Sequence, residues 1–169
     1  HFIDPVSMTK IAWHTNYQEV IAIGKLFETG NLFTERVVSI AGPAARNPRL
    51  VKTRVGACLC ELTKEETHET EEIRTISGSV FGGRTSEGKF CYLGRFHSQV
   101  TLMKEGFERE FLGWHSPGFD KFSVKPIYIS RFLGKKFGFN TNTNGSHRSI
   151  VPIGSFEKVM PMDILPTFM

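Results

Sequence analysis

The sequence lacks any long hydrophobic run. None of its apolar stretches approaches the roughly 18 residues that a membrane-spanning helix needs, and the segment 11–27 is interrupted by charged and polar side chains. No basic segment followed by an apolar one stands at its start, so no signal peptide is expected. The sequence therefore predicts no membrane span, and a start at His1 rather than Met indicates a piece of a longer protein.

Cysteine is scarce as well. The three cysteines, Cys58, Cys60 and Cys91, make an odd number and show no CxxC spacing. This argues against a disulfide framework and against a closed zinc site, and an iron–sulfur cluster usually needs four such ligands. We expect Cys58 and Cys60, an i, i+2 pair, to pack in the core, and the cysteine usage fits a reducing compartment.

A strong charge of one sign is also absent. Twenty-one Lys and Arg against seventeen Asp and Glu leave a net charge of +4. The basic residues form no stripe interleaved with aromatics, so nucleic-acid binding is not expected. The one acidic cluster, residues 61–72, is typical of an exposed loop, with a partner-binding surface as the alternative.

What the chain has is apolar and aromatic residues in quantity: 40% are hydrophobic and fifteen are Phe, so 169 residues can fold into one globular domain or two small ones. Apolar periodicity predicts a helix over 16–27 that stops at Gly30, and β-rich alternation predicts strands. The expected elements are strands 34–41 and 50–55 as a hairpin, a short helix 56–66, and strands 73–80 and 90–103. This order indicates an α+β unit.

The composition changes at Phe107, where we place a soft boundary. Beyond it the pattern predicts a short helix over 127–137 and a strand over 150–153. Pro161 and the apolar residues after it indicate the start of a further helix.

The sequence offers no recognisable catalytic centre. The glycine-rich stretch 77–85 lacks the Lys of a phosphate-binding loop and lies between two predicted strands, so a turn is the better interpretation. The six histidines form no i, i+4 pair, and no GxSxG motif is present. The isolated carboxylates Asp4, Asp120 and Asp163 do not pair for acid–base work. We therefore predict no catalytic, cofactor-binding or metal-ligating residue.

Several segments together resemble one family. The stretches HFIDPVSMTK, VIAIGKLFETG, ERVVSIAGP, RTISGSVFGGR, YLGRFHSQV, GWHSPG, DKFSV, TNGSHRSIVPIG and FEKVMPMDILPT are similar, in collinear order, to the middle of the A subunit of the bacterial sodium-translocating NADH:quinone oxidoreductase. The resemblance implies the end of a Rossmann-like domain over 1–33 and a β-grasp domain, ubiquitin-like and of the soluble-ligand-binding type, over 34–113. A truncated C-terminal α+β region would follow over 114–169.

The resemblance also implies a setting. The protein would be a peripheral, cytoplasm-facing part of an inner-membrane complex that oxidises NADH, reduces ubiquinone and pumps sodium, and it would dock chiefly on the membrane-embedded B subunit. FAD, FMN, riboflavin and iron–sulfur centres are expected in other subunits and none in this segment, which would serve structure and docking. The alternative is a module that binds ubiquinone directly.

Four residues are candidates for contact with another subunit: Gly82, Gly83, Arg84 and Arg95. They would form a loop and rim of the β-grasp domain, where Arg is favoured because it hydrogen-bonds several acceptors. For the alternative, the aromatic side chains of Phe81, Tyr92 and Phe96 could stack on a quinone head, although alternating aromatics usually belong to a core or an interface.

Overall fold

The structure is a computed structural model that describes residues 7–66, 72–123, 125, 127–147, 149, 151 and 153–160. The chain divides into two compact units, residues 1–106 with 135–140 and residues 107–134 with 141–169. The named strands and α-helices all lie in the first unit. In its described part, the second unit consists of turns and two short 3-10 helices, η2 (Gly113–His115) and η3 (Ile129–Leu133).

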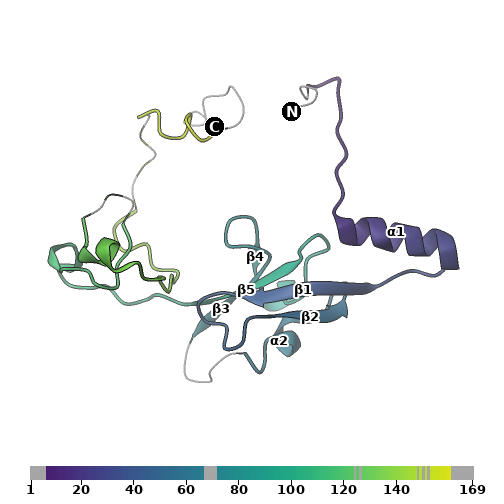
Figure 1. Cartoon of the computed structure of the whole chain (residues 1–169), viewed down its shortest axis with the longest axis horizontal. Coiled ribbons are helices and arrows are strands. Elements are labelled where there is room, and N and C mark those ends of the chain that lie inside the picture. The colour runs from purple at the N-terminus through teal and green to yellow at the C-terminus, as the bar shows by residue number, and fades with distance from the viewer. Residues whose placement is uncertain are drawn as a thin grey trace. The chain divides into compact units, whose positions relative to one another are not determined.

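A mixed five-stranded sheet forms the centre of the first unit (Figure 1). Its strands are β1 (Glu35–Ala41), β2 (Arg49–Arg54), β3 (Ile73–Ser77), β4 (Arg84–Thr85) and β5 (Gln99–Lys104), in the spatial order β2-β1-β5-β3-β4. β1 and β5 run parallel, and the other neighbours run antiparallel. The predicted hairpin and the α+β class are confirmed.

The first helix, α1 (Tyr17–Thr29), confirms the predicted helix and its stop at Gly30, although it extends two residues beyond the predicted end at 27. The side chain of Asn16 accepts a hydrogen bond from the backbone of Glu19 at 2.9 Å, and Gly30 closes the helix at φ 70°. Asparagine satisfies a free amide at a helix start, and glycine tolerates the left-handed angle at its end. The apolar side chains of α1 are largely exposed, and Glu19 is its only buried residue.

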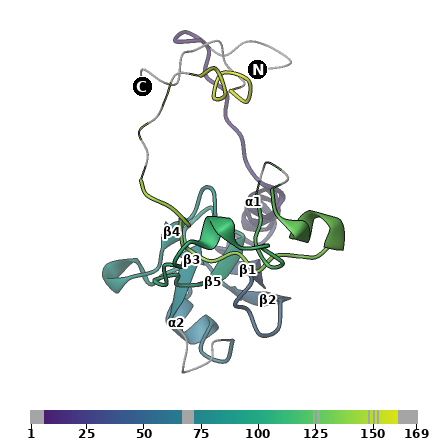
Figure 2. The same cartoon turned by 90° about the vertical axis from the view of Figure 1, so that its left-hand side faces the viewer.

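The core of the sheet unit lies under the second helix, α2 (Leu59–Leu62). Leu59 packs against Val38 of β1, Val100 of β5 and Leu93, all nearly inaccessible to water. Figure 2 shows α2 on one side of the sheet. The predicted helix 56–66 is therefore too long, because Gly56 turns the chain at φ 71° before α2 begins.

The predicted strand 90–103 is wrong in its first half. Residues 88–90 form a 3-10 helix, η1 (Gly88–Phe90), and the chain then turns where the His97 amide donates to the Gly94 carbonyl at 3.0 Å. A Cβ at Gly94 would lie 2.8 Å from Cε1 of His97, so a larger residue there would displace the imidazole. Apolar alternation could not reveal this turn, and β5 begins at residue 99. Strand 73–80 is likewise shorter, because Gly78 leaves β3 at φ 102°.

In the described part of the acidic cluster, Glu61, Glu65 and Glu72 are exposed, as its composition predicts, and Glu66 is the exception. Glu66 is only 2% exposed; it forms an ion pair with Arg49 and accepts the backbone amide of Asn47 at 3.0 Å. A buried carboxylate needs such partners. Residues 67–71 lie outside the described residues.

In the second unit, the side chain of Lys121 connects several described segments. Its ammonium group pairs with Glu110 and donates to the Gly113 carbonyl at 2.7 Å. The helix predicted over 127–137 is confined to η3 and stops at Gly134, which has φ 55°.

No strand is present at the described residues of 150–153. The amide of Ile153 donates to the carbonyl of Val151 at 2.8 Å, a tight turn that a paired strand would not make. Residues 150 and 152 lie outside the described residues, as does the helix predicted from Pro161.

Candidate functional site

The two candidate glycines lie in the β3–β4 hairpin turn. The amides of Gly82 and Gly83 donate to the side chain and the carbonyl of Ser79, at 3.2 and 2.8 Å. A Cβ at Gly83 would lie 2.7 Å from the carbonyl oxygen of Ser77. Gly83 is therefore needed for the fold of the turn, whatever the hairpin contacts.

Arg84 of β4 is exposed but held in place from within. Its guanidinium donates to the Tyr92 carbonyl at 3.1 Å and lies over the ring of Phe90, 5.3 Å from the centroid. A cation over an aromatic face gains about 0.5–1 kcal/mol at an exposed site. The arrangement presents a fixed, planar cation next to aromatic surface.

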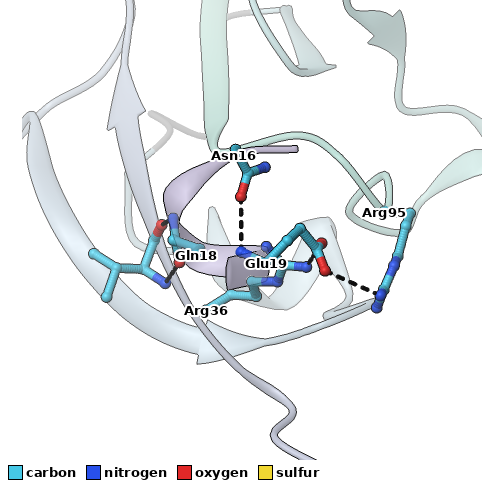
Figure 3. Close-up of polar contacts among 6 residues, drawn as sticks. Asn16, Gln18, Glu19, Arg36 and Arg95 are labelled. Carbon is cyan, nitrogen blue, oxygen red and sulfur yellow. Dashed lines mark hydrogen bonds and ion pairs between the residues drawn. The ribbon is translucent and has the colours of Figure 1, made fainter. Parts of the chain in front are cut away.

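Arg95 does not take part in that arrangement. Its side chain, 57% exposed, pairs with the carboxylate of Glu19 on α1 at 3.2 Å. The other oxygen of Glu19 pairs with Arg36 of β1, as Figure 3 shows. The four candidate residues therefore occupy two places: a hairpin rim of Gly82, Gly83 and Arg84, and an ion-pair cluster that contains Arg95.

The aromatic side chains considered for quinone contact do not pack in the core. Phe81, Tyr92 and Phe96 are all more than half exposed, and all three lie outside the strands. A core position is thus excluded for them. Their exposure is compatible both with an interface with a partner and with stacking on a flat ligand.

A partly buried polar pair that the sequence did not reveal lies at the end of β3. Ser77 is fully buried and accepts the amide of Gly94 at 2.9 Å, and its hydroxyl oxygen lies 2.8 Å from Nδ1 of His97. The pKa of His97 is lowered, chiefly by desolvation and to a smaller extent by the positive charge of Arg84. The pair joins β3 to the loop before β5, and no sequence motif marks it.

The three cysteines come together from two separate stretches of the chain. Cys58 pairs with Tyr92 in an isolated β-bridge, and the amide of Leu59 donates to the Cys91 carbonyl at 2.8 Å. A hydrogen bond with the Cys91 side chain is the main cause that raises the pKa of the Cys60 thiol. Cys60 is exposed rather than buried, so the core position expected for it is wrong.

Metal ligands and membrane spans give no further candidate. Among the residues that the structure describes, no three His, Cys, Asp or Glu side chains are placed to hold a metal ion. Within the same ranges, no helix has the length and apolar character needed to cross a membrane.

Comparison with known proteins adds the family. Residues 1–32 match the model of the NqrA second alpha/beta domain, and residues 37–88 match the model of the NQRA C-terminal domain. The chain is 57% identical over 169 residues to the A subunit of the Na(+)-translocating NADH-quinone reductase of Actinobacillus succinogenes, a match that covers 100% of this chain and 38% of the relative. The proteins of the same name from Histophilus somni and Pseudomonas aeruginosa are 53% and 54% identical, over 100% and 99% of this chain and 38% of each relative.

The chain thus spans less than two fifths of the length of these relatives. The match nevertheless runs along the whole chain and includes two consecutive domains of one protein. Over its length, the chain belongs to the NqrA family, the A subunits of the Na(+)-translocating NADH-quinone reductase.

Proposed function

We propose that this chain is the central part of a peripheral subunit in a membrane complex that oxidises NADH, reduces ubiquinone and moves sodium ions. In this complex the segment acts as a docking and structural element and holds no redox centre of its own; flavins and iron–sulfur centres belong to other subunits. The observation that carries the proposal is the 57% identity along the entire chain to a protein named as the A subunit of that reductase. The complex would lie in the bacterial inner membrane, with this part of it on the cytoplasmic side.

The domain assignment is part of the proposal. Residues 1–33 would close a Rossmann-like domain, 34–113 would form a β-grasp domain, and 114–169 would begin the C-terminal region. The sheet order β2-β1-β5-β3-β4, with the parallel pair β1 and β5 at its centre and a helix packed on β1 and β5, supports the β-grasp assignment.

The hairpin rim is the proposed contact with the membrane-embedded B subunit. Arg84 is anchored by Tyr92 and Phe90 and so loses little conformational freedom on binding, which favours a role at an interface. Phe81 is fully exposed three residues before it. Arg95 keeps donor nitrogens for a partner beyond its pair with Glu19, since its side chain is more than half exposed.

A capture experiment tests the docking proposal. The purified chain is bound to a resin and mixed with detergent-solubilised complex that lacks the A subunit, and retained proteins are identified by mass spectrometry. Retention of the B subunit is expected for the natural chain and a clear loss for Arg84→Ala. Arg54→Ala, an exposed arginine at the end of β2, is the matched control and should retain the B subunit normally.

Two results would contradict docking through the rim. Equal retention by Arg84→Ala and Arg54→Ala would remove the rim from the interface. No retention by a folded natural chain would remove docking from this segment.

Direct quinone binding is the second candidate, favoured by the exposure of Phe81, Tyr92 and Phe96. If it is correct, a ubiquinone analogue should quench the exposed Trp13 saturably in the natural chain. A Phe81→Ala/Phe96→Ala variant should then raise the dissociation constant. Linear, unsaturable quenching would reject this candidate and leave docking as the proposal.

A further inference from the structure

We infer that the first turn of α1 is a fixed joint between the two domains of this family, in which Gln18 and Glu19 set the orientation of the second alpha/beta domain on the sheet of the C-terminal domain. This inference uses the family assignment and the contacts of α1, and it does not depend on the proposed function. It holds whether or not the hairpin rim docks on the B subunit.

The position of the joint follows from where the two family models meet. The first model ends at residue 32 and contains α1, whereas the second begins at residue 37 within β1. Contacts between α1 and β1 therefore link one domain to the next. These contacts are long-range in sequence, because Gln18 lies 19 residues before Val37.

The first component of the joint is an ion-pair triad in which Glu19 and Arg36 are buried and Arg95 is exposed. Arg36 lies on the same buried face of β1 as Val38 and Ile40, and it is only 6% exposed. A guanidinium in such a place needs a counter-charge. Glu19, itself 7% exposed, supplies it with one oxygen and binds Arg95 with the other at 3.2 Å (Figure 3). If α1 moved away from β1, Arg36 would be left buried without its partner.

The second component pairs a side chain with the strand backbone. The amide group of Gln18 donates to the Val37 carbonyl at 2.8 Å and accepts the Val37 N–H at 2.9 Å. The pairing of β5 with β1 begins only at Ser39, so this part of the β1 edge has no described strand beside it. The Gln18 side chain makes the two hydrogen bonds that a neighbouring strand residue would make, and so fixes the position of α1 along β1.

The rest of α1 has few apolar contacts with the sheet, so the polar contacts of its first turn carry most of the attachment. Val20, Ile23 and Phe27 are at least half exposed, so among the described residues α1 gains little from apolar packing on the sheet. The side chain of Asn16 adds a further hydrogen bond at the N-terminal end of α1, where it caps the helix by accepting the amide of Glu19. The joint therefore depends on charge and hydrogen bonding at one end of α1.

Hydrogen exchange of the Val37 amide, measured with residue resolution by mass spectrometry on the full-length protein in its assembled complex, is the direct readout. Its N–H bonds the side chain of Gln18, whereas the Ser39 amide, on the same edge, bonds the Ser98 carbonyl at 3.0 Å. In Glu19→Gln we expect exchange at Val37 to accelerate by about tenfold or more, since a hydrogen bond to a charged partner is lost. Exchange at Ser39 should stay unchanged.

Orientation is measured in the same variants by pulsed electron spin resonance between two non-cysteine nitroxide labels, placed at the exposed Lys64 after α2 and the exposed Asn31 after α1. The natural protein should give one narrow distance distribution and Glu19→Gln a broadened one. The matched control is Glu28→Gln, an exposed glutamate on the same helix, which should change neither readout. Arg95→Ala leaves the pair of Glu19 with Arg36 in place and should give an intermediate broadening, even if Glu19→Gln fails to assemble.

Unchanged Val37 exchange together with an unchanged distance distribution in both Glu19→Gln and Arg95→Ala would overturn the joint. Retention of the B subunit is scored separately in the capture experiment. A rigid joint with failed capture would reject docking through the rim and leave the joint standing. Unchanged exchange and distances with normal capture would reject the joint and leave docking standing.

Discussion

The hydroxyl of Ser77 and the imidazole of His97 form a hydrogen-bonded pair, with 2.8 Å between Oγ and Nδ1. The Ser77 oxygen also accepts the Gly94 amide, and it keeps one lone pair and its own hydrogen for the contact with Nδ1, so the hydroxyl can pair with either tautomer of the imidazole. The pKa of His97 is lowered by desolvation and by the positive charge of Arg84, which both favour the neutral ring.

The first prediction concerns acid stability. The pKa of His97 is lowered in the folded protein from an ordinary value of 6.5, so the unfolded chain binds the proton more readily. The contribution of neutral His97 to the free energy of unfolding is fully present above about pH 6.5 and is lost as the pH falls through the lowered pKa. We expect His97→Gln to flatten this part of the profile of unfolding free energy, measured by urea denaturation between about pH 5 and 8. His14→Gln, at an exposed histidine, should keep the slope.

A second prediction concerns Gly42, after β1. It has φ 123°, and an added Cβ would overlap the Leu102 carbonyl and lie 2.7 Å from the Leu102 nitrogen. Gly42→Ala should therefore lower the free energy of unfolding by about 3 kcal/mol. Gly24→Ala in α1 is the control: open space surrounds Gly24, so the higher helix propensity of Ala should raise stability by up to about 1 kcal/mol. Equal effects of the two changes would contradict the close approach at Gly42.

The core contact of α2 gives a third prediction. Leu59 is completely buried against β1 and β5, so Leu59→Ala should cost about 2–5 kcal/mol of unfolding free energy. Leu50→Ala on β2 removes the same atoms from an exposed position and should change stability by less than about 0.5 kcal/mol. Chemical denaturation of both variants measures the difference, and similar losses would place the core elsewhere.

The cysteine cluster gives a fourth prediction. Its hydrogen bond with Cys91 raises the pKa of Cys60 above 9.0, so less reactive thiolate is present at a given pH. Cys91→Ala should lower that pKa and accelerate alkylation of Cys60 by iodoacetamide at mildly alkaline pH, followed by mass spectrometry. Cys58→Ala should act more weakly, because Cys58 contributes the smallest effects. A slower reaction in Cys91→Ala would contradict the contact.

Local signals in the sequence were sufficient for several elements. Asn16 and Gly30 mark the ends of α1, and the alternation before Gly42 predicts β1 and its hairpin with β2. These features depend on capping residues and on the alternation of apolar and polar residues, and both can be recognised in a short stretch of sequence. The predicted strand 90–103 failed because the packing of His97 against two glycines, rather than hydrophobic alternation, shapes the chain there.

The parts that sequence reasoning missed depend on distant partners. Glu66 is buried because Arg49, 17 residues away, neutralises it. Arg95 was expected at a rim, yet it pairs with Glu19 across 76 residues. No spacing rule connects such residues, so their roles required the fold.

Docking through the hairpin rim is tested most directly by photocross-linking in the assembled complex. A benzophenone amino acid replaces the exposed Phe81, and a second variant carries it at the exposed Leu50 on β2 as the control. After irradiation, we expect a cross-link from position 81 to the B subunit and none from position 50. Equal cross-linking from both positions, or no cross-link to the B subunit from position 81 in an active complex, would contradict the proposed interface.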